Sequence, residues 1–206
     1  MGGYRLNTDF EEVLTKLGRF SGFAFGHKEN GAMFSHMSIM WANALLKRGL
    51  VEEGLKVIET IYRHCQNFPK SHIYPGIPEY INPQGRGMYP YLTGSASWLL
   101  LTMLAEVYGV KGNFGDLVIE PKLSQEIFDE QGMASVSTQF AGRQLQVTYS
   151  NPERLEFGGY SIHAIKIDGK EITIDRNKKS ATLSREVLED LSSDQLHGIE
   201  VELRSH

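Results

Sequence analysis

The sequence predicts a mixed α and β protein with a helical first part, residues 1–112, and a β-rich second part, residues 113–206. Up to about residue 110 the apolar residues recur at helical spacing, whereas after Gly112 they alternate with polar residues at the two-residue period of strands. Turn-forming pairs such as Ala141-Gly142 and Asp168-Gly169 separate the alternating runs. We therefore expect a helical domain followed by an antiparallel, β-sandwich-like domain.

Four helices are expected in the first part, over residues 10–17, 32–47, 51–62 and 95–108. Thr8 or Asp9 is the expected cap of the first helix, and Gly49 the residue that ends the second. The second and fourth helices are apolar on more than one face, as buried helices are. The third helix carries a single apolar stripe, as outer helices do. A long proline- and glycine-bearing stretch, residues 68–91, precedes the fourth. This alternation suits helical hairpins arranged in a toroid.

Six short strands are expected in the second part, over residues 116–120, 135–140, 144–149, 163–167, 171–174 and 199–203. Asn151-Pro152 and Arg176-Asn177 add two further turn signals between them. Residues 184–196 lack the alternation, so a helix or an irregular turn is expected there. The spacing of the strands is that of a sandwich or barrel-like pair of sheets.

Composition and charge exclude several classes of protein. The chain is 41% hydrophobic and 22% charged, which is ordinary for a globular protein, and its net charge of -4 does not favour nucleic acid as a partner. Residues 1–112 carry +2 and residues 113–206 carry -6, so an anionic ligand is expected in the first part. The single Cys65 excludes an internal disulfide. No signal pattern or membrane-length apolar run is present, so we expect a cytoplasmic protein without a membrane segment.

The first candidate constellation is His27-Lys28-Glu29-Asn30-Gly31, followed by a helix that holds His36. Near the start of a helix, His36 would lie where backbone N–H groups favour anions. A structural alternative stays open, with Lys28 and Glu29 as a solvated pair, Asn30 as the helix cap and His36 as a hydrogen-bonded core residue.

The second constellation is Gly85-Arg86-Gly87 and then Leu92-Thr93-Gly94-Ser95-Ala96-Ser97-Trp98. Small residues let a ligand approach the backbone closely, and the N–H groups of Gly94, Ser95 and Ala96 are expected to be unpaired at the helix start. The alternative is an ordinary helix cap that uses the hydroxyl of Thr93 or Ser95. Trp98 is either a sugar-stacking ring or a core residue. No histidine and cysteine spacing typical of a metal site is present, so no metal is expected.

Taken together, these segments resemble the inverting glycoside phosphorylases of the cellobiose, cellodextrin and chitobiose phosphorylase type, and the C-terminal module of cyclic β-1,2-glucan synthases. The resemblance extends over residues 20–123 and includes the residues 28–36, 74–76, 85–87, 92–98 and 115–121. It implies the C-terminal part of an (α/α)6 barrel in residues 1–112, followed by a C-terminal β domain in residues 113–206.

In that family, inorganic phosphate attacks the anomeric carbon while one aspartic acid protonates the leaving sugar oxygen. The resemblance assigns phosphate binding to His36, Thr93 and Gly94, and by looser extrapolation sugar binding to the four residues Lys28, Glu29, Gln84 and Arg86. Phosphate is then a co-substrate, an oligosaccharide is the other ligand, and no cofactor is expected.

The family's catalytic aspartate, and an arginine that helps to hold phosphate, lie in a motif upstream of everything present here. Residues 1–7 also read like the interior of a longer protein, and no Asp lies between Asp9 and Asp116. We therefore expect a C-terminal fragment without a catalytic residue, inactive by itself, that self-associates or docks onto its N-terminal remainder. The alternative is a noncatalytic carbohydrate-binding or docking module. A polysaccharide-binding β domain would require rows of exposed aromatic residues, for which Phe140, Tyr149, Phe157 and Tyr160 are not obviously aligned.

Overall fold

The computed structural model describes residues 4–73, 76–91, 93–174 and 178–205. Within these ranges it contains five α-helices and eleven β-strands, so the fold is mixed α and β. The chain divides into two compact units, unit 1 being Met1–Thr102 and unit 2 Met103–His206. The change of sequence period at residue 112 falls inside strand β4, Val110–Asn113, which belongs to unit 2.

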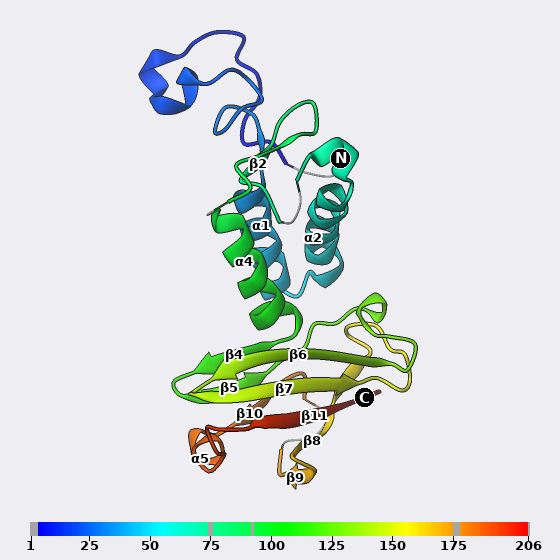
Figure 1. The fold of residues 1–206 in the computed structure, drawn as a ribbon. Helices are drawn as coiled ribbons and strands as arrows, with labels where there is room; N and C mark the ends of the chain where they lie inside the picture. The colour runs from blue at the N-terminus through cyan, green and yellow to red at the C-terminus, as the bar shows by residue number, and fades with distance from the viewer. Residues whose placement is uncertain (1–3, 74–75, 92, 175–177, 206) are drawn as a thin grey trace. The chain divides into compact units, whose positions relative to one another are not determined.

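Unit 1 is built on α1, which packs between α2 and α4 (Figure 1). Helix α1 spans Ser35–Lys47, α2 Val51–Gln66, α3 Phe68–Ser71 and α4 Gly94–Thr102. Gly49, at a φ of 78°, ends α1 in a left-handed conformation, which confirms its predicted role. The core between the helices contains Ile39, Ala42, Leu45, Leu46, Val57, Ile58 and Ile61. No helix in the described part of the chain combines the length and the apolar character that a membrane span requires.

A small three-stranded sheet shortens the predicted second helix at its start. Strand β1, Met33–Phe34, pairs with β2, Tyr80–Ile81, which in turn pairs with β3, Gly87–Met88. Helix α1 therefore begins at Ser35 and not at Ala32, because the backbone just before it is used in the sheet. The sheet joins the proline-bearing stretch to the beginning of α1.

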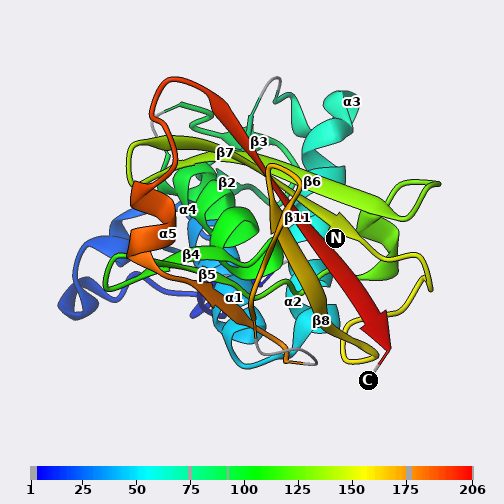
Figure 2. The same ribbon diagram turned by 90° about the horizontal axis from the view of Figure 1, so that it is seen from below.

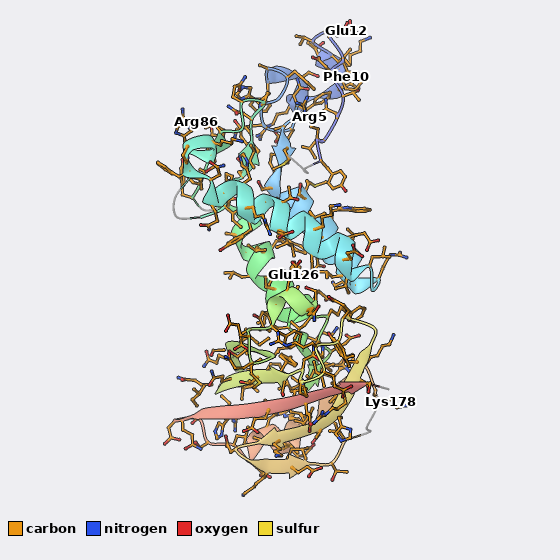
Figure 3. The ribbon with its side chains drawn as sticks, turned by 90° about the vertical axis from the view of Figure 1, so that its right-hand side faces the viewer. Arg5, Phe10, Glu12, Arg86, Glu126 and Lys178 are labelled. Atoms are coloured by element: carbon orange, nitrogen blue, oxygen red, sulfur yellow. The ribbon has the colours of Figure 1, made fainter. Side chains whose placement is uncertain are left out.

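The predicted helix over residues 10–17 is wrong. The structure has 3-10 turns at Thr15–Leu17 and Arg19–Gly22 instead, and Phe10 lies on a loop at the far end of unit 1 from its helices (Figure 3). Phe10, Val13 and Leu17 are 46%, 71% and 56% exposed. A short helix is marginal in water unless it buries its apolar face, and this segment buries none of these three side chains.

Unit 2 contains two sheets (Figure 2). The larger has the order β6-β7-β11-β8-β9 and the smaller the order β10-β5-β4. Their strands are β4 Val110–Asn113, β5 Asp116–Ile119, β6 Met133–Phe140, β7 Arg143–Ser150, β8 Tyr160–Ile167, β9 Lys170–Ile172, β10 Ala181–Leu183 and β11 Leu196–Ser205. All six predicted strands are present, and β4 and β10 are additional. The short helix α5, Arg185–Glu189, lies in the predicted 184–196 segment, whereas Arg176-Asn177 lies outside the described residues.

One strand pair departs from the predicted antiparallel arrangement, because β11 runs parallel to β7. A hairpin turn forces antiparallel pairing, as between β6 and β7, but β11 follows β7 only after β8, β9, β10 and α5. A connection of that length allows β11 to run either parallel or antiparallel to β7. On its other side β11 pairs antiparallel with β8.

Two buried tyrosines attach the segment around residues 108–123 to the larger sheet. Tyr149 on β7 donates its hydroxyl hydrogen to the carbonyl oxygen of Tyr108. Tyr160 on β8 accepts from the Leu123 N–H at 2.8 Å and donates to the Leu123 carbonyl oxygen at 3.0 Å. Burial raises the pKa of both tyrosines, so both hydroxyls stay protonated and able to donate. Apolar side chains from both sheets fill the core: Leu117, Ile119, Leu145, Val147, Ile165, Ile199, Val201 and Leu203.

A buried ion pair lies at the beginning of unit 2. Glu106 belongs to a π-helical turn, Met103–Val107, and its Oε2 atom is 2.9 Å from the Nζ atom of Lys122. The two residues are only 4% and 5% exposed. The Lys122 N–H also donates to the carbonyl oxygen of Val107, so backbone and side chain both connect the turn to the segment around Lys122.

A histidine–aspartate pair near the start of β11 predicts a pH dependence of stability. The buried His197 has its Nδ1 atom 2.6 Å from an oxygen of Asp168 and its Nε2 atom 3.0 Å from the Ser192 carbonyl oxygen. The hydrogen bond to Asp168 raises the pKa of His197 above its ordinary 6.5, and the same bond lowers the pKa of Asp168. Because the raised pKa belongs to the folded state, this stabilisation is complete below about pH 6.5 and is lost as the pH rises through the folded-state value.

We expect the free energy of unfolding, measured by urea denaturation, to contain a component that falls as the pH rises above about 6.5. A His197→Gln variant should lose that component, because glutamine does not titrate. The histidine His163 on β8, half-buried, supplies the matched control, and His163→Gln should keep the component. Equal pH profiles for His197→Gln and the unchanged chain would contradict the assignment.

Candidate functional site

His36 and Gly94 lie in direct contact, although 58 positions of sequence separate them. His36 is the second residue of α1 and Gly94 the first of α4. A Cβ atom at Gly94 would be 2.8 Å from the Cε1 atom of His36, closer than two carbon atoms can approach, so any larger residue would displace the His36 ring. The ring of Trp98 has its centroid 6.2 Å from that of His36. The structure thus brings together two of the three residues expected to bind phosphate.

Two consecutive backbone carbonyls hold the two helix starts together. The Ser35 N–H, at the start of α1, donates to the carbonyl oxygen of Glu79 at 2.9 Å. The Ser95 hydroxyl, at the start of α4, donates to the carbonyl oxygen of Pro78, also at 2.9 Å. Both serines are fully buried. The Pro78-Glu79 pair therefore fixes where His36 and Gly94 meet, and sequence reasoning did not single it out.

Thr93 caps α4, as the structural alternative had it. Its Oγ1 atom accepts from the Ser95 N–H at 3.2 Å, and its carbonyl oxygen is 3.3 Å from the Ala96 nitrogen. The prediction that the N–H groups of Gly94, Ser95 and Ala96 are all unpaired is therefore wrong for Ser95 and Ala96. Among the described residues, the Gly94 N–H has no hydrogen-bond acceptor. The Thr93 hydroxyl is 2.8 Å from the Ser95 hydroxyl, which itself donates to Pro78, so Thr93 is the donor in that bond.

One nitrogen of His36 is buried without a partner. The Nε2 atom is shielded from solvent and has no hydrogen-bond partner in the described part of the chain. Buried polar atoms in proteins almost always have partners, so an orphaned ring nitrogen marks a place where a ligand or water would bind. The ring lies against Gly94, and Thr93, whose hydroxyl can rotate, directly precedes Gly94 in the chain. His36, Thr93 and Gly94 together are therefore the candidate anion site.

Lys28 and Glu29 are not paired with each other. Lys28, at a φ of 45°, occupies a tight turn between His27 and Asn30, and its Nζ atom lies 3.9 Å from an oxygen of Glu79. Glu29 has one carboxylate oxygen 3.1 Å from Arg19, and the other is buried without a partner among the described residues. The structural alternative of a solvated Lys28–Glu29 pair is therefore wrong.

Asn30 is not the cap of α1, which begins five residues later. Its side-chain nitrogen donates to the carbonyl oxygen of Phe23 at 2.7 Å, and its side-chain oxygen accepts from Asn7 at 3.1 Å. Asn7 in turn accepts from the Gly31 N–H at 2.6 Å. Asn30 thus stabilises the turn that presents Lys28 and Glu29.

Gln84 and Arg86 lie in the turn that joins β2 to β3. Both side chains are exposed, and Arg86 lies at the periphery of unit 1 (Figure 3). The Asn82 side-chain oxygen accepts from both of their N–H groups, at 3.1 and 2.9 Å. Across the described ranges, neither side chain has a hydrogen bond or ion pair to His36 or Lys28. Their sugar-binding roles stay predictions. Tyr74, Pro75 and Leu92, which belong to the matched motifs, lie outside the described residues.

Comparison with known proteins relates the chain to glycoside phosphorylases. It is 27% identical over 145 residues to the N,N'-diacetylchitobiose phosphorylase of Vibrio proteolyticus, and 23% identical over 155 residues to that of Vibrio furnissii. These matches include 66% and 71% of this chain but 18% of each relative, so the chain spans less than a fifth of the length of the curated relatives it matches. No protein-family model matches. The resemblance to cyclic β-1,2-glucan synthases stays a prediction.

Proposed function

We propose that this chain is the C-terminal part of a glycoside phosphorylase acting on β-linked glycosides, and that unit 1 supplies part of its phosphate and sugar site. The observation that carries the proposal is the buried, unpaired Nε2 atom of His36 against the first residue of α4. The similarity to two chitobiose phosphorylases supports it, because phosphate and a sugar are what such enzymes bind. The general acid and a phosphate-binding arginine belong to upstream residues.

In the proposed reaction, phosphate attacks the anomeric carbon and needs no nucleophile from the protein. His36, the Gly94 N–H and the rotated Thr93 hydroxyl hold the phosphate oxygens, and a lone carboxyl group upstream protonates the leaving sugar oxygen. When Thr93 turns toward phosphate, its Oγ1 atom still accepts from the Ser95 N–H. The cap of α4 and the phosphate contact are therefore compatible.

Exposed apolar side chains on α1 and α4 support the proposal of an incomplete (α/α)6 barrel. Met37 and Trp41 on α1 are 51% and 50% exposed, and Leu100 and Leu101 on α4 are 72% and 52% exposed. Apolar patches of this kind are usually interfaces. In the proposed enzyme, upstream helices pack on these faces, and the chain alone docks onto that N-terminal remainder or self-associates through them.

The proposed anion site is tested by sulfate binding, since sulfate is tetrahedral and keeps its charge near neutral pH. We expect the chain to bind sulfate with a dissociation constant on the order of millimolar, because few donors are present. His36→Ala and Gly94→Ala should each weaken binding about tenfold or more, as loss of a hydrogen bond to a charged group costs about 1.5–3 kcal/mol.

Gly22→Ala is the matched control, since a Cβ atom at Gly22 meets nothing within 4 Å and its φ is ordinary. It should bind sulfate as the unchanged chain does. Chemical shifts of the His36 ring in a sulfate titration measure the effect directly. Sulfate binding that is the same in His36→Ala and in the unchanged chain would place the anion elsewhere and remove the support for a phosphorylase.

A carbohydrate-binding β domain is less well supported as the alternative function. Of its four candidate aromatic residues, Tyr149 and Tyr160 are buried in the core of unit 2, with exposures of 0% and 4%. They cannot stack on a polysaccharide. The larger sheet carries an open hollow. Polar and charged side chains such as Thr148, Ser150 and Glu200 line it together with the apolar Met133 and Val201, and none of its described lining residues is aromatic.

A further inference from the structure

Three tyrosines of unit 1 form a row that runs from its interior to its surface. Tyr80 is buried, with 3% exposure, and stacks on Phe34 at a centroid distance of 6.3 Å. Tyr89 follows at 6.1 Å from Tyr80, and Tyr91 at 6.5 Å from Tyr89. The outer two rings are 42% and 66% exposed. The row therefore ends in two accessible aromatic rings on a rigid base, two residues before Thr93.

The backbone is strained at the place where this row meets Lys28. Tyr89 has a φ of 55° and Lys28 a φ of 45°, a region that residues with a Cβ atom seldom adopt. The side chains of these two residues face each other, with the Lys28 Nζ atom 4.2 Å from the centre of the Tyr89 ring. Strained conformations of this kind concentrate at ligand-binding sites, where they fix side chains in one arrangement.

A cation and a carboxylate lie together beside the exposed rings. The Lys28 ammonium is 3.9 Å from the Glu79 carboxylate, too far for a hydrogen bond, and the two side chains are 22% and 33% exposed. Among the described residues, no acceptor lies within hydrogen-bond distance of Lys28. Both groups can therefore bond to ligand hydroxyls, Lys28 as donor and Glu79 as acceptor. This differs from the faces of α1 and α4, whose exposed side chains are aliphatic or indole and favour a protein partner.

On the basis of the proposed phosphorylase function, we infer that Tyr89 and Tyr91, with Lys28 and Glu79 beside them, form a second sugar-binding position. The rings present apolar faces for the C–H groups of a sugar ring, and the charged pair binds its hydroxyls. The position lies next to the helix start that carries Thr93 and Gly94. The site then binds an oligosaccharide of more than two sugar units, and the units beyond the second bind at Tyr89 and Tyr91.

The experiment compares oligosaccharides of different length on the 206-residue chain by ligand-observed NMR. The probes are N,N'-diacetylchitobiose and tetra-N-acetylchitotetraose, with cellobiose and cellotetraose as a second pair. We expect a tetrasaccharide of one series to bind about threefold to tenfold more tightly than its disaccharide, the gain expected from one aromatic contact. In Tyr91→Ala, the affinity for the tetrasaccharide should fall to that for the disaccharide, and the affinity for the disaccharide should stay unchanged.

Two further variants separate a sugar contact from a change in folding. Tyr91→Phe keeps the ring and should bind the tetrasaccharide nearly as well as the unchanged chain. Tyr62→Ala removes a tyrosine of similar exposure, 54%, from α2 and should change nothing. If both tetrasaccharides bind no better than the disaccharides, or if Tyr91→Ala binds them as the unchanged chain does, the inference is overturned.

The outcomes also distinguish this inference from the proposed function. Tetrasaccharide binding that depends on Tyr91, in a chain that binds no sulfate, would support the sugar position and argue against a phosphorylase. Sulfate binding that depends on His36, with no preference for longer oligosaccharides, would support the phosphorylase and overturn the sugar position.

Discussion

Replacing Glu106 with alanine is expected to lower the free energy of unfolding of unit 2 by about 3–5 kcal/mol, because a buried ion pair that loses one partner leaves the other charge uncompensated. The side chains of Lys122 and Glu106 are only 7% and 5% exposed, so water screens the remaining charge poorly. Denaturation in urea, followed by the near-ultraviolet signal of the buried tyrosines of unit 2, measures the change.

Two controls test whether the loss of stability comes from the burial of the ion pair or from its charge alone. The Lys111–Glu120 pair has the same chemistry, but its side chains are 30% and 33% exposed, so Glu120→Ala should cost less than about 1 kcal/mol. Removing both buried partners with Glu106→Leu and Lys122→Met should be nearly neutral or stabilising, by up to about 4 kcal/mol, since no unpaired charge remains. A loss of less than about 1 kcal/mol for Glu106→Ala would mean that Lys122 reaches solvent or another carboxylate.

The isolated chain is expected to release no sugar 1-phosphate from cellobiose, laminaribiose, sophorose or chitobiose in the presence of phosphate. General acid assistance contributes about 10²–10⁴ to the rate of such a reaction, and no aspartate lies between Asp9 and Asp116. The carboxylates of unit 1 nearest in sequence to the site each lie within 4 Å of a cation, Glu29 of Arg19 and Glu79 of Lys28. Among the described residues, neither carboxylate has a hydrogen bond to His36.

The measurement is a coupled assay for sugar 1-phosphate on protein purified to homogeneity, with His36→Ala as the control for contaminating enzyme. Background release should be the same for both proteins. Release of sugar 1-phosphate that survives purification and disappears in His36→Ala would show that a residue of this chain supplies the proton. The proposal that the general acid belongs to upstream residues would then be wrong.

The general plan of the fold could be predicted from the sequence because it rests on local patterns. The change of period separated helices from strands, and Gly49 marked the end of α1. Strand β4 was missed because its last two residues, Gly112 and Asn113, are of types depleted in strands, and the short strand β10 was missed as well. The helical spacing of residues 10–17 failed as a predictor for a different reason. The pattern is present, but nothing in the described chain covers it.

The candidate site could be predicted only in part. Motif resemblance singled out His36, Thr93 and Gly94, and the structure brings His36 and Gly94 into contact. The partners of Lys28 could not be foreseen, because Glu79 and Tyr89 come from a loop whose path depends on the small sheet. The sequence does not distinguish an N–H group that awaits a ligand from one that is capped, and Thr93 caps two of the three.

The Pro78-Glu79 carbonyls also determine how the site responds to change elsewhere. The two carbonyls belong to consecutive peptide units joined at the Glu79 Cα atom, so covalent geometry limits how far apart the anchor points of α1 and α4 can lie. Substitutions in the core between the helices can tilt or loosen their far ends while the near ends stay in register. A one-residue insertion between positions 78 and 79 would separate those ends and leave the core intact. The position of His36 relative to Gly94 therefore depends on the length of the chain at this one bond.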